Sequence, residues 1–444
     1  NNINIYIMSN VGKTANKIKE KTGQTINVMK NAMDQVMSGN CYLIVVYLVC
    51  IIFLIIFSYS IYLRREMSKG ERTIKEMKRI QDSDKNPLLQ ALTLDDYRKE
   101  GDKPKTLFAL IDYYVKSSFN SCCTGPIING HVSLDALKFV INQGVRFLDF
   151  EIYLIKDRAV VAVGRDNIYI KDSLNELNLA EVFDTIKVNA LESASIENNT
   201  DPLILHFRIM SNNDNVYTIL AHTIKKYFSD YLVSSQYGFC GEVIESAGQS
   251  GRGRKYTGNS KSKFKNNVLF ADLIKLRQKV VIFASGPKHN PRSYKENREF
   301  YEIMNGGFND GYVLHKTDYT INEASEKTTQ EEHKNHYCIS LPDITSKENS
   351  NAPLHWKRGT QAIMMNFGAG FNKSNMEYYK KMFAKEKRAF VLKPKHLRRN
   401  RIFAGKPTPQ DPRLNPIQKH CKLDNGAGGF IEIAGVPGGA PTCE

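Results

Sequence analysis

An uncharged apolar run restricts the fold of this chain more than any other feature. Residues 41–63, CYLIVVYLVCIIFLIIFSYSIYL, are 23 consecutive positions without a charged side chain. As a helix, this run is long enough to cross a hydrocarbon core of about 30 Å. It is too long, and too far from the first residue, to be the core of a signal peptide. Buried helices of soluble proteins rarely stay uncharged for this length, so we predict one transmembrane helix at 41–63.

The two flanks of this run differ in charge. The C-terminal flank is basic through Arg64, Arg65, Lys69, Arg72, Lys75, Lys78 and Arg79, whereas residues 26–40 carry Lys30 with Asp34 against it. The positive-inside rule therefore predicts a single-pass protein whose C-terminal part is cytosolic. The chain's net charge of +16 favours a polyanionic partner. Beside a membrane helix we expect that partner to be anionic headgroups, at about 1 kcal/mol per basic residue, and not nucleic acid. A merely solvated flank is the alternative.

Composition divides the rest of the chain into four further segments. Residues 1–40 have apolar side chains at three- and four-residue spacing, which predicts an amphipathic N-terminal segment, and Met8 is a candidate first residue. Residues 64–104 are rich in charge and are predicted to be a basic juxtamembrane linker. Residues 105–400 hold the globular domain. Residues 401–444 are dense in Pro and Gly and predict a tail without regular structure.

The cysteines give little indication of a special site. The eight cysteines are scattered and form no CxxC pair, which favours a reducing compartment over a disulfide framework. The adjacent Cys122 and Cys123 are expected to pack against the domain interior. His333, His336 and Cys338 are zinc-binding residue types, but no second pair of ligands follows them, so we expect no zinc there.

Short β-rich runs recur through the globular domain. They lie at 118–122, 146–154, 159–164, 202–209, 279–285, 337–341, 360–367 and 389–394. Helical patterns separate several of them, such as SLDALKFVINQG, in which Ser133 is a candidate N-cap and Gly144 a stop. Eight mostly buried strands with intervening helices predict an α/β fold, a TIM (β/α)8 barrel. The gap between the second and third runs is too short for a helix, so the barrel is predicted to be irregular there.

Five of these segments, in this order, resemble the X and Y boxes of the phosphatidylinositol-specific phospholipase C family. SSFNS is similar to that family's Ser-Ser-His-Asn-Thr strand, GVRFLDFEIY to the strand with its Glu-Leu-Asp sequence, and PLILHFRI to its Pro-Val-Ile-Leu-Ser-Leu-Glu strand. GTQAIMMNF and AFVLKPKHLR resemble the signatures of the Y box. The likeness extends over about residues 105–400, and more narrowly it looks like the divergent, membrane-anchored versions of large DNA viruses and some protists.

The resemblance implies a catalytic mechanism that this chain departs from. In the family, one histidine acts on the inositol 2-hydroxyl and a second stabilises the pentavalent phosphorus, which is general acid–base chemistry. Phe119 stands at the first of these positions and Arg165 at the second. A phenyl ring exchanges no proton, and an arginine stays protonated and cannot act as a base. His206 is a weak candidate to replace them.

The resemblance also implies a calcium ion, held in the family by Asn, Glu, Asp and Glu. Asn120, Asp149 and Glu151 occupy three of these positions, with Asp and Glu exchanged, but Arg208 replaces the fourth ligand. Asp149 and Glu151 are two residues apart and share one face of a strand, as do His206 and Arg208. We therefore expect a remnant calcium site in which Arg208 lies between the carboxylates, and no bound cofactor. A purely structural ion-pair cluster is the alternative.

Three functions follow from these observations. The first is a membrane-anchored phospholipase C-like protein without catalysis, which binds anionic lipid or an unidentified protein partner on the cytosolic face of a host membrane or a viral envelope. The second is an active phosphoinositide phosphodiesterase that uses Arg165 and Arg208 in place of histidine and calcium. The third is a structural viral membrane protein in which the barrel only supplies surface.

Overall fold

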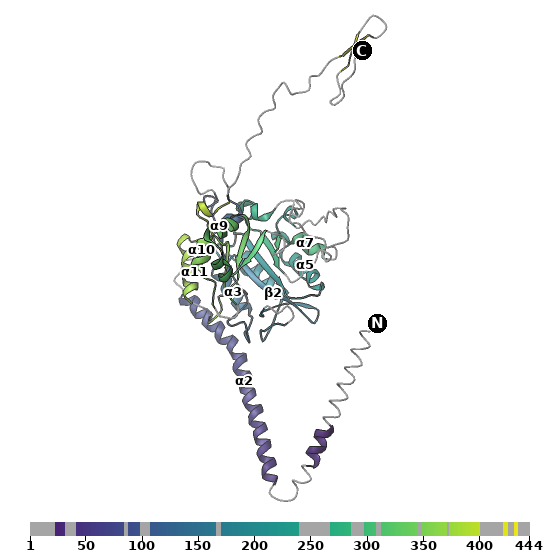
Figure 1. The fold of residues 1–444 in the computed structure, drawn as a ribbon, viewed down its shortest axis with the longest axis vertical. Helices are drawn as coiled ribbons and strands as arrows, with labels where there is room; N and C mark the ends of the chain where they lie inside the picture. The colour runs from purple at the N-terminus through teal and green to yellow at the C-terminus, as the bar shows by residue number, and fades with distance from the viewer. Residues whose placement is uncertain are drawn as a thin grey trace. The chain divides into compact units, whose positions relative to one another are not determined.

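A computed structural model of the protein describes residues 23–31, 41–83, 88–97, 107–165, 170–238, 267–285, 297–307, 312–343, 348–370, 373–399, 421–424 and 430–433. The chain forms two compact units, residues 1–399 and 400–444. The first unit contains a large sheet and the helices around it, and the second contains a two-stranded hairpin (Figure 1).

Eight parallel strands form the centre of the first unit. They are β1 Tyr113–Ser118, β2 Phe147–Ile155, β5 Leu203–Ile209, β6 Val280–Ser285, β7 Gly306–Gly307, β8 Val313–Lys316, β9 Tyr337–Ser340 and β10 Ala362–Met365. Their order in space is β7-β6-β5-β2-β1-β10-β9-β8, so the first strand pairs with the last and brings the sheet round on itself. Among the described residues, β7 and β8 do not pair with each other. The protein is therefore a nearly closed TIM barrel, which confirms the predicted fold.

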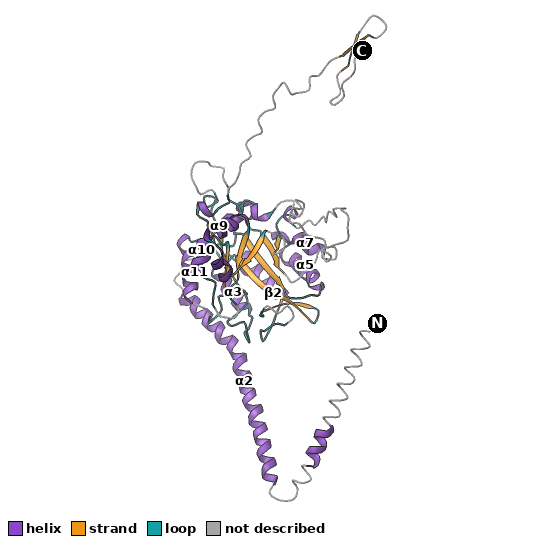
Figure 2. Cartoon of the chain, viewed as in Figure 1, coloured by secondary structure: helices purple, strands orange, loops and turns teal. Residues whose placement is uncertain are grey.

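Helices surround these strands (Figure 2). They are α3 Leu134–Asn142, α4 Leu179–Ile186, α5 Asn215–Phe228, α7 Arg298–Ile303, α8 Asp318–Glu323, α9 Glu326–Asn335, α10 Ala352–Arg358 and α11 Lys373–Glu386. The helix α3 begins and ends as the sequence predicts. The Ser133 side chain accepts a hydrogen bond from the backbone N–H of Asp135, and Gly144 follows the helix at a φ of +74°.

Six of the eight predicted strands are barrel strands, and two are not. The run at 159–164 contains β3 Arg158–Ala162, which forms an antiparallel hairpin with β2 and also pairs with the short β4 Leu177–Asn178. The run at 389–394 contains β11 Phe390–Leu392, which lies antiparallel to β1 outside the barrel order. The sequence did not indicate β7 and β8, because two and four residues are too few to show a period. The run at 118–122 was placed too late, since β1 ends at Ser118.

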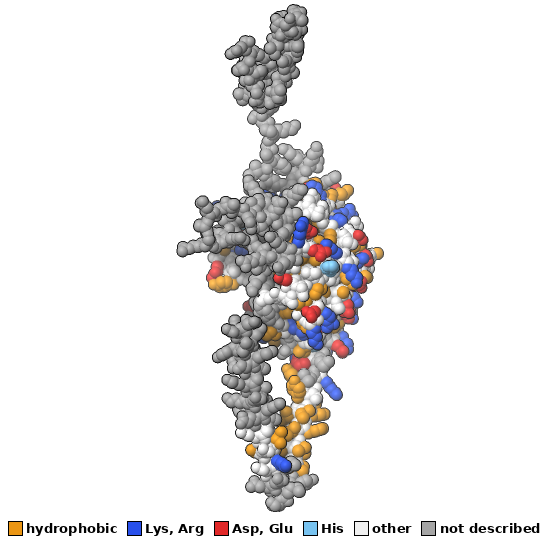
Figure 3. Space-filling model, turned by 90° about the vertical axis from the view of Figure 1, so that its right-hand side faces the viewer, with side chains coloured by type: hydrophobic (Ala, Val, Ile, Leu, Met, Phe, Trp, Pro, Cys, Tyr) orange, Lys and Arg blue, Asp and Glu red, His pale blue; other side chains and the backbone are white. Residues whose placement is uncertain are grey.

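The apolar run forms the first half of α2, a single helix of 43 residues from Cys41 to Ser83. By length and composition, this is one helix that could cross a membrane, and its apolar stretch is not buried by the rest of the structure. Figure 3 shows the hydrophobic side chains gathered along it. Residues 64–83, part of the predicted juxtamembrane linker, are helical, because no proline interrupts the sequence here and the helix continues.

The second half of α2 packs on the barrel. Glu66, Gly70 and Met77 are buried at helical spacing on one face of the helix. A Cβ placed on Gly70 would lie 2.8 Å from the ring of His131, in the loop before α3, so helix and loop are in close contact. Residues 88–97 also belong to the domain, because Leu89, Leu92 and Tyr97 are in its hydrophobic core.

The terminal segments are only partly described. Residues 23–31 of the predicted amphipathic segment are helical, and the rest of that segment lies outside the described residues. In the C-terminal unit, β12 Cys421–Asp424 and β13 Phe430–Ile433 pair antiparallel. The expectation of a tail without regular structure is therefore wrong at this hairpin, where two short β-prone runs flank the turn sequence NGAGG. The remaining residues of 401–444 lie outside the described residues.

Candidate functional site

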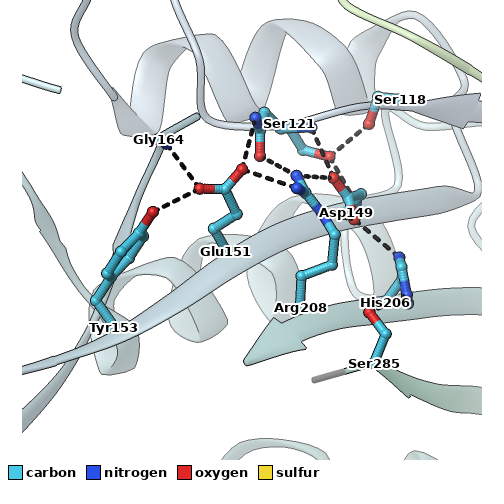
Figure 4. Close-up of polar contacts among 10 residues, drawn as sticks. Ser118, Ser121, Asp149, Glu151, Tyr153, Gly164, His206, Arg208 and Ser285 are labelled. Atoms are coloured by element: carbon cyan, nitrogen blue, oxygen red, sulfur yellow. Dashed lines mark hydrogen bonds and ion pairs between the residues drawn. The ribbon is translucent and has the colours of Figure 1, made fainter. Parts of the chain in front are cut away.

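Charged side chains are exceptional in the barrel strands. Both faces of β2, β5 and β6 are covered, and such strands are normally near-continuous apolar runs. Asp149 and Glu151 on β2 are nevertheless buried, and in the register of the sheet they stand opposite His206 and Arg208 on β5. Ser285, the last residue of β6, stands opposite Arg208. The carboxyl ends of parallel strands meet at one rim, so these side chains form one cluster at the mouth of the barrel (Figure 4).

Arg208 lies between the two carboxylates. Its Nε donates to Asp149 Oδ1 at 3.0 Å and its Nη2 to Asp149 Oδ2 at 2.8 Å. Its Nη1 donates to Glu151 Oε1 at 2.8 Å, and Nη2 also donates to the side-chain oxygen of Asn120. The guanidinium carbon lies 4.5 Å from the centre of the Phe119 ring, a cation–π distance. The aromatic ring of Phe119 therefore packs against the guanidinium of Arg208.

The turn after β1 is shaped to complete this cluster. Asn120 has a φ of +45°, a conformation that asparagine tolerates better than most residues. Its backbone N–H donates to Asp149 Oδ2 at 3.0 Å and its Nδ2 to Glu151 Oε1 at 3.2 Å. Ser121 Oγ accepts from the backbone N–H of Asp149 and is hydrogen-bonded to Ser118 Oγ. These bonds fix the turn against β2.

The second oxygen of Glu151 is also occupied. The Tyr153 hydroxyl donates to Oε2 at 2.8 Å, and the backbone N–H of Gly164 donates to it at 2.7 Å. Burial raises the pKa of Glu151, and the charge of Arg208 and the hydroxyl of Tyr153 offset only part of this. Burial also acts on Asp149, but there Arg208 and His206 outweigh it and hold the pKa of the carboxyl well below its usual range. Burial acts to lower the pKa of Arg208, and the two carboxylates raise it above its usual range, so the guanidinium stays charged.

The residues at the predicted calcium site do not fit that ion. Calcium takes six to eight oxygen ligands. Here the oxygens of Asn120, Asp149 and Glu151 already accept from a cationic guanidinium that stands among them, and the fourth ligand position is that same arginine. In the described part of the chain, no group of three or more His, Cys, Asp or Glu side chains could hold a metal ion. Of the zinc-binding residue types noted in the sequence, His333 has its Nδ1 within hydrogen-bond distance of the carbonyl oxygen of Arg358.

His206 is part of the cluster and not an isolated core residue. Its Nδ1 lies 2.8 Å from Asp149 Oδ1, and its Nε2 lies 3.2 Å from Ser285 Oγ. The ring of His315, on β8, stands edge-on to it with 5.4 Å between centroids. The sequence analysis did not single out Ser285 or His315. Ser285 had a usable signal, since a polar residue ending an apolar β-run falls at the rim of a barrel.

Two predicted features lie outside the cluster. The guanidinium of Arg165 pairs with Asp172, with Nη2 3.1 Å from Oδ1, and its side chain is 53% exposed. In the described part of the chain, Arg165 therefore contacts Asp172 and not Asp149 or Glu151. Cys122 and Cys123 are buried, and burial raises the pKa of both thiols, that of Cys123 to about 11. These thiols are therefore poor nucleophiles.

Comparison with known proteins finds a family model that matches part of the domain. The family model described as phosphatidylinositol-specific phospholipase C, X domain, matches residues 108–248, a range that contains β1, β2 and β5. No curated protein matches the chain.

Solved structures of phospholipases C are also similar. PLC21 of L. pealei is 16% identical, with a TM-score of 0.49, over 66% of this chain and 38% of that one. The calcium-dependent phosphoinositol-specific phospholipase C of a Pseudomonas species is 9% identical, with a TM-score of 0.39, over 64% and 96%. The phosphatidylinositol-specific phospholipase C of Listeria monocytogenes is 12% identical, with a TM-score of 0.34, over 62% and 94%. This chain thus spans well under half the length of the L. pealei protein. Residues 108–248 of this chain are thus similar to the X domain of phosphatidylinositol-specific phospholipase C.

Proposed function

We propose that this protein is a membrane-anchored phospholipase C-like protein that does not catalyse the calcium-dependent reaction of its family. It binds an anionic phospholipid headgroup, or a protein partner, at the cytosolic face of the membrane. The observation that carries this proposal is that Arg208 donates to both Asp149 and Glu151. These are two of the positions that, by resemblance, would hold the calcium ion of the family.

The family's reaction lacks its groups here. Phe119 has no lone pair with which to take the proton of an inositol hydroxyl, and its ring is buried under Arg208. The guanidinium of Arg165 is paired with Asp172, and a guanidinium is not a base in proteins. Phe119 and Arg165 therefore cannot supply the acid–base chemistry that the resemblance assigns to their positions.

The membrane role rests on α2. Its apolar first half has the length and composition of a membrane span. Past this half, Glu66, Gly70 and Met77 face the barrel, while the basic side chains are exposed. The exposed basic residues are Arg64, Arg65, Lys69, Arg72, Lys75, Lys78 and Arg79. Basic side chains beside a span are attracted to anionic headgroups and favour the cytosolic side.

Reconstitution of the full chain tests the proposal. The protein is placed in vesicles of phosphatidylcholine, with or without phosphatidylinositol, and both lipid turnover and thermal unfolding are measured. We expect no calcium-dependent release of inositol phosphate, and a higher unfolding temperature with phosphatidylinositol. Replacing the seven exposed basic residues of α2 by Gln should reduce that stabilisation.

The alternatives give different results in the same assay. Calcium-dependent release of inositol phosphate overturns the proposal. Release that needs no calcium supports an active phosphodiesterase that uses Arg208 in place of the metal ion. Unfolding that is indifferent to phosphatidylinositol supports a barrel that only supplies surface.

A further inference from the structure

Ser285, His206 and Asp149 form a continuous chain of hydrogen bonds across three neighbouring strands. Ser285 Oγ lies 3.2 Å from His206 Nε2, and His206 Nδ1 lies 2.8 Å from Asp149 Oδ1 (Figure 4). The relative exposure of the three residues falls from 7% for Ser285 to 1% for His206 and 0% for Asp149. Ser285 is therefore the least buried residue of the three, and Asp149 is the most buried.

The direction of the hydrogen bonds follows from the charge of Asp149. Asp149 is held ionised by Arg208, which donates to both of its oxygens, so it accepts the bond from His206. The imidazole proton then lies on Nδ1, and Nε2 is left to accept from the Ser285 hydroxyl. This is the polarity of a nucleophile, a base and an orienting carboxylate.

We propose that Ser285, His206 and Asp149 are a nucleophile–base–carboxylate triad that cleaves an uncharged carboxylic ester, such as an acyl ester of a lipid presented at the membrane surface. The class of substrate follows from the charge around the serine. The positive charge of Arg208 is already paired with Asp149 and Glu151. The cluster therefore offers little attraction to an anionic phosphodiester and suits an uncharged ester better.

The reaction proceeds in two balanced steps. Ser285 Oγ bonds to the ester carbonyl carbon while its proton moves to His206 Nε2, and the ester C–O bond then breaks as the alcohol leaves with that proton. Water next attacks the acyl-serine and gives a proton to His206. The carboxylic acid is released, and the proton returns to Ser285 Oγ. Asp149 stabilises the imidazolium in both steps, and Arg208 acts as a positioning residue for Asp149.

A serine-directed fluorophosphonate probe tests this triad on the full chain in detergent micelles. An activated serine forms an O–P bond and fluoride leaves the phosphorus with the serine's proton. We expect mass spectrometry to find the probe on the Ser285 peptide and not on Ser121, a buried serine of the same cluster that is bonded to Ser118 and to the backbone of Asp149. This experiment locates the probe on the unaltered sequence, so its result does not depend on whether a variant folds.

Variants and an ester substrate complete the test. Ser285→Ala should abolish labelling, and His206→Gln should reduce its rate at least about tenfold. Ser234→Ala, at an exposed serine, should change neither the extent nor the rate of labelling. Hydrolysis of p-nitrophenyl butyrate should follow the same order. Absence of the probe from Ser285, or labelling that is indifferent to His206→Gln in a folded variant, overturns the triad. Labelling of Ser285 and release of inositol phosphate are separate readouts, so this inference and the proposed function can fail independently.

Discussion

At the scale of the single residue, Arg208 determines the electrostatics of the barrel mouth. It donates four hydrogen bonds to Asn120, Asp149 and Glu151 and is itself almost buried. Removing one partner of a buried ion pair leaves an uncompensated charge, which costs much more than the pair itself contributes. The charge balance of this buried cluster therefore depends on one side chain.

Replacing this arginine should destabilise the fold strongly. We expect Arg208→Met to lower the free energy of unfolding by about 3–5 kcal/mol, because two buried carboxylates lose their cation. The matched control is Arg165→Met, whose half-exposed pair with Asp172 should contribute at most about 1 kcal/mol. Denaturant unfolding of both variants measures the difference. Equal, small effects would show that Arg208 does not neutralise the cluster.

Also at the residue scale, the buried Lys393 should make the free energy of unfolding depend on pH. It is 1% exposed, and its Nζ donates to the carbonyl of His333. Burial lowers its pKa to about 7 from 10.5, and nearby Cys338 and Asp112 offset this only in part. Between these two values the unfolded chain binds more protons than the folded one, so the free energy of unfolding should rise with pH.

The expected slope is about 1 kcal/mol per pH unit between pH 7 and 9 relative to the variant Lys393→Met. Comparing the slopes of the unaltered chain and of Lys393→Met removes the contributions of other titrating groups. Thermal unfolding of both proteins across this pH range measures the two slopes. A difference between the two proteins that does not change with pH would contradict a buried, mainly neutral lysine.

At the scale of elements, α2 and the loop before α3 are coupled through Gly70. A Cβ at this position would meet the ring of His131 at 2.8 Å. We expect Gly70→Val to lower the free energy of unfolding by about 1–3 kcal/mol, because a side chain there forces helix and loop apart. Gly23→Ala is the control, since nothing lies within 4 Å of a Cβ at Gly23. Hydrogen exchange should also rise in the 125–135 loop of the Gly70 variant alone, and unchanged exchange would contradict close packing.

The elements show where sequence patterns succeed and where they fail. The capped helix α3 and the long strands β2, β5 and β6 follow from local signals. The role of each strand does not, because β3 and β11 have the same apolar pattern as barrel strands and differ only in their spatial partners.

The candidate site was predictable to the same extent. Two-residue spacing alone predicts that Asp149 and Glu151 share one face of their strand, and that His206 and Arg208 share one face of theirs. The bond between His206 and Ser285 joins residues 79 positions apart, and it depends on β5 and β6 being neighbours. The pairing of Arg165 with Asp172 likewise depends on the conformation of the loop after β3.

At the scale of the whole molecule, the charge of α2 predicts the orientation of the protein. With basic residues 64–79 on the cytosolic side, the barrel should resist protease added to intact cells and be digested after permeabilisation. Neutralising those basic residues should produce a mixed orientation. Digestion of the barrel in intact cells expressing the unaltered chain would contradict a cytosolic barrel.

The response of the protein to calcium tests the central claim, that an arginine stands where the family holds its metal ion. The measurement is the unfolding temperature of the unaltered chain and of Arg208→Glu, with and without calcium and with magnesium as the control. We expect no effect of calcium on the unaltered chain. Arg208→Glu should be less stable without calcium and should gain about 2.7 kcal/mol at a concentration one hundred times its dissociation constant. Stabilisation of the unaltered chain by calcium, reversed by a chelator, would contradict the account.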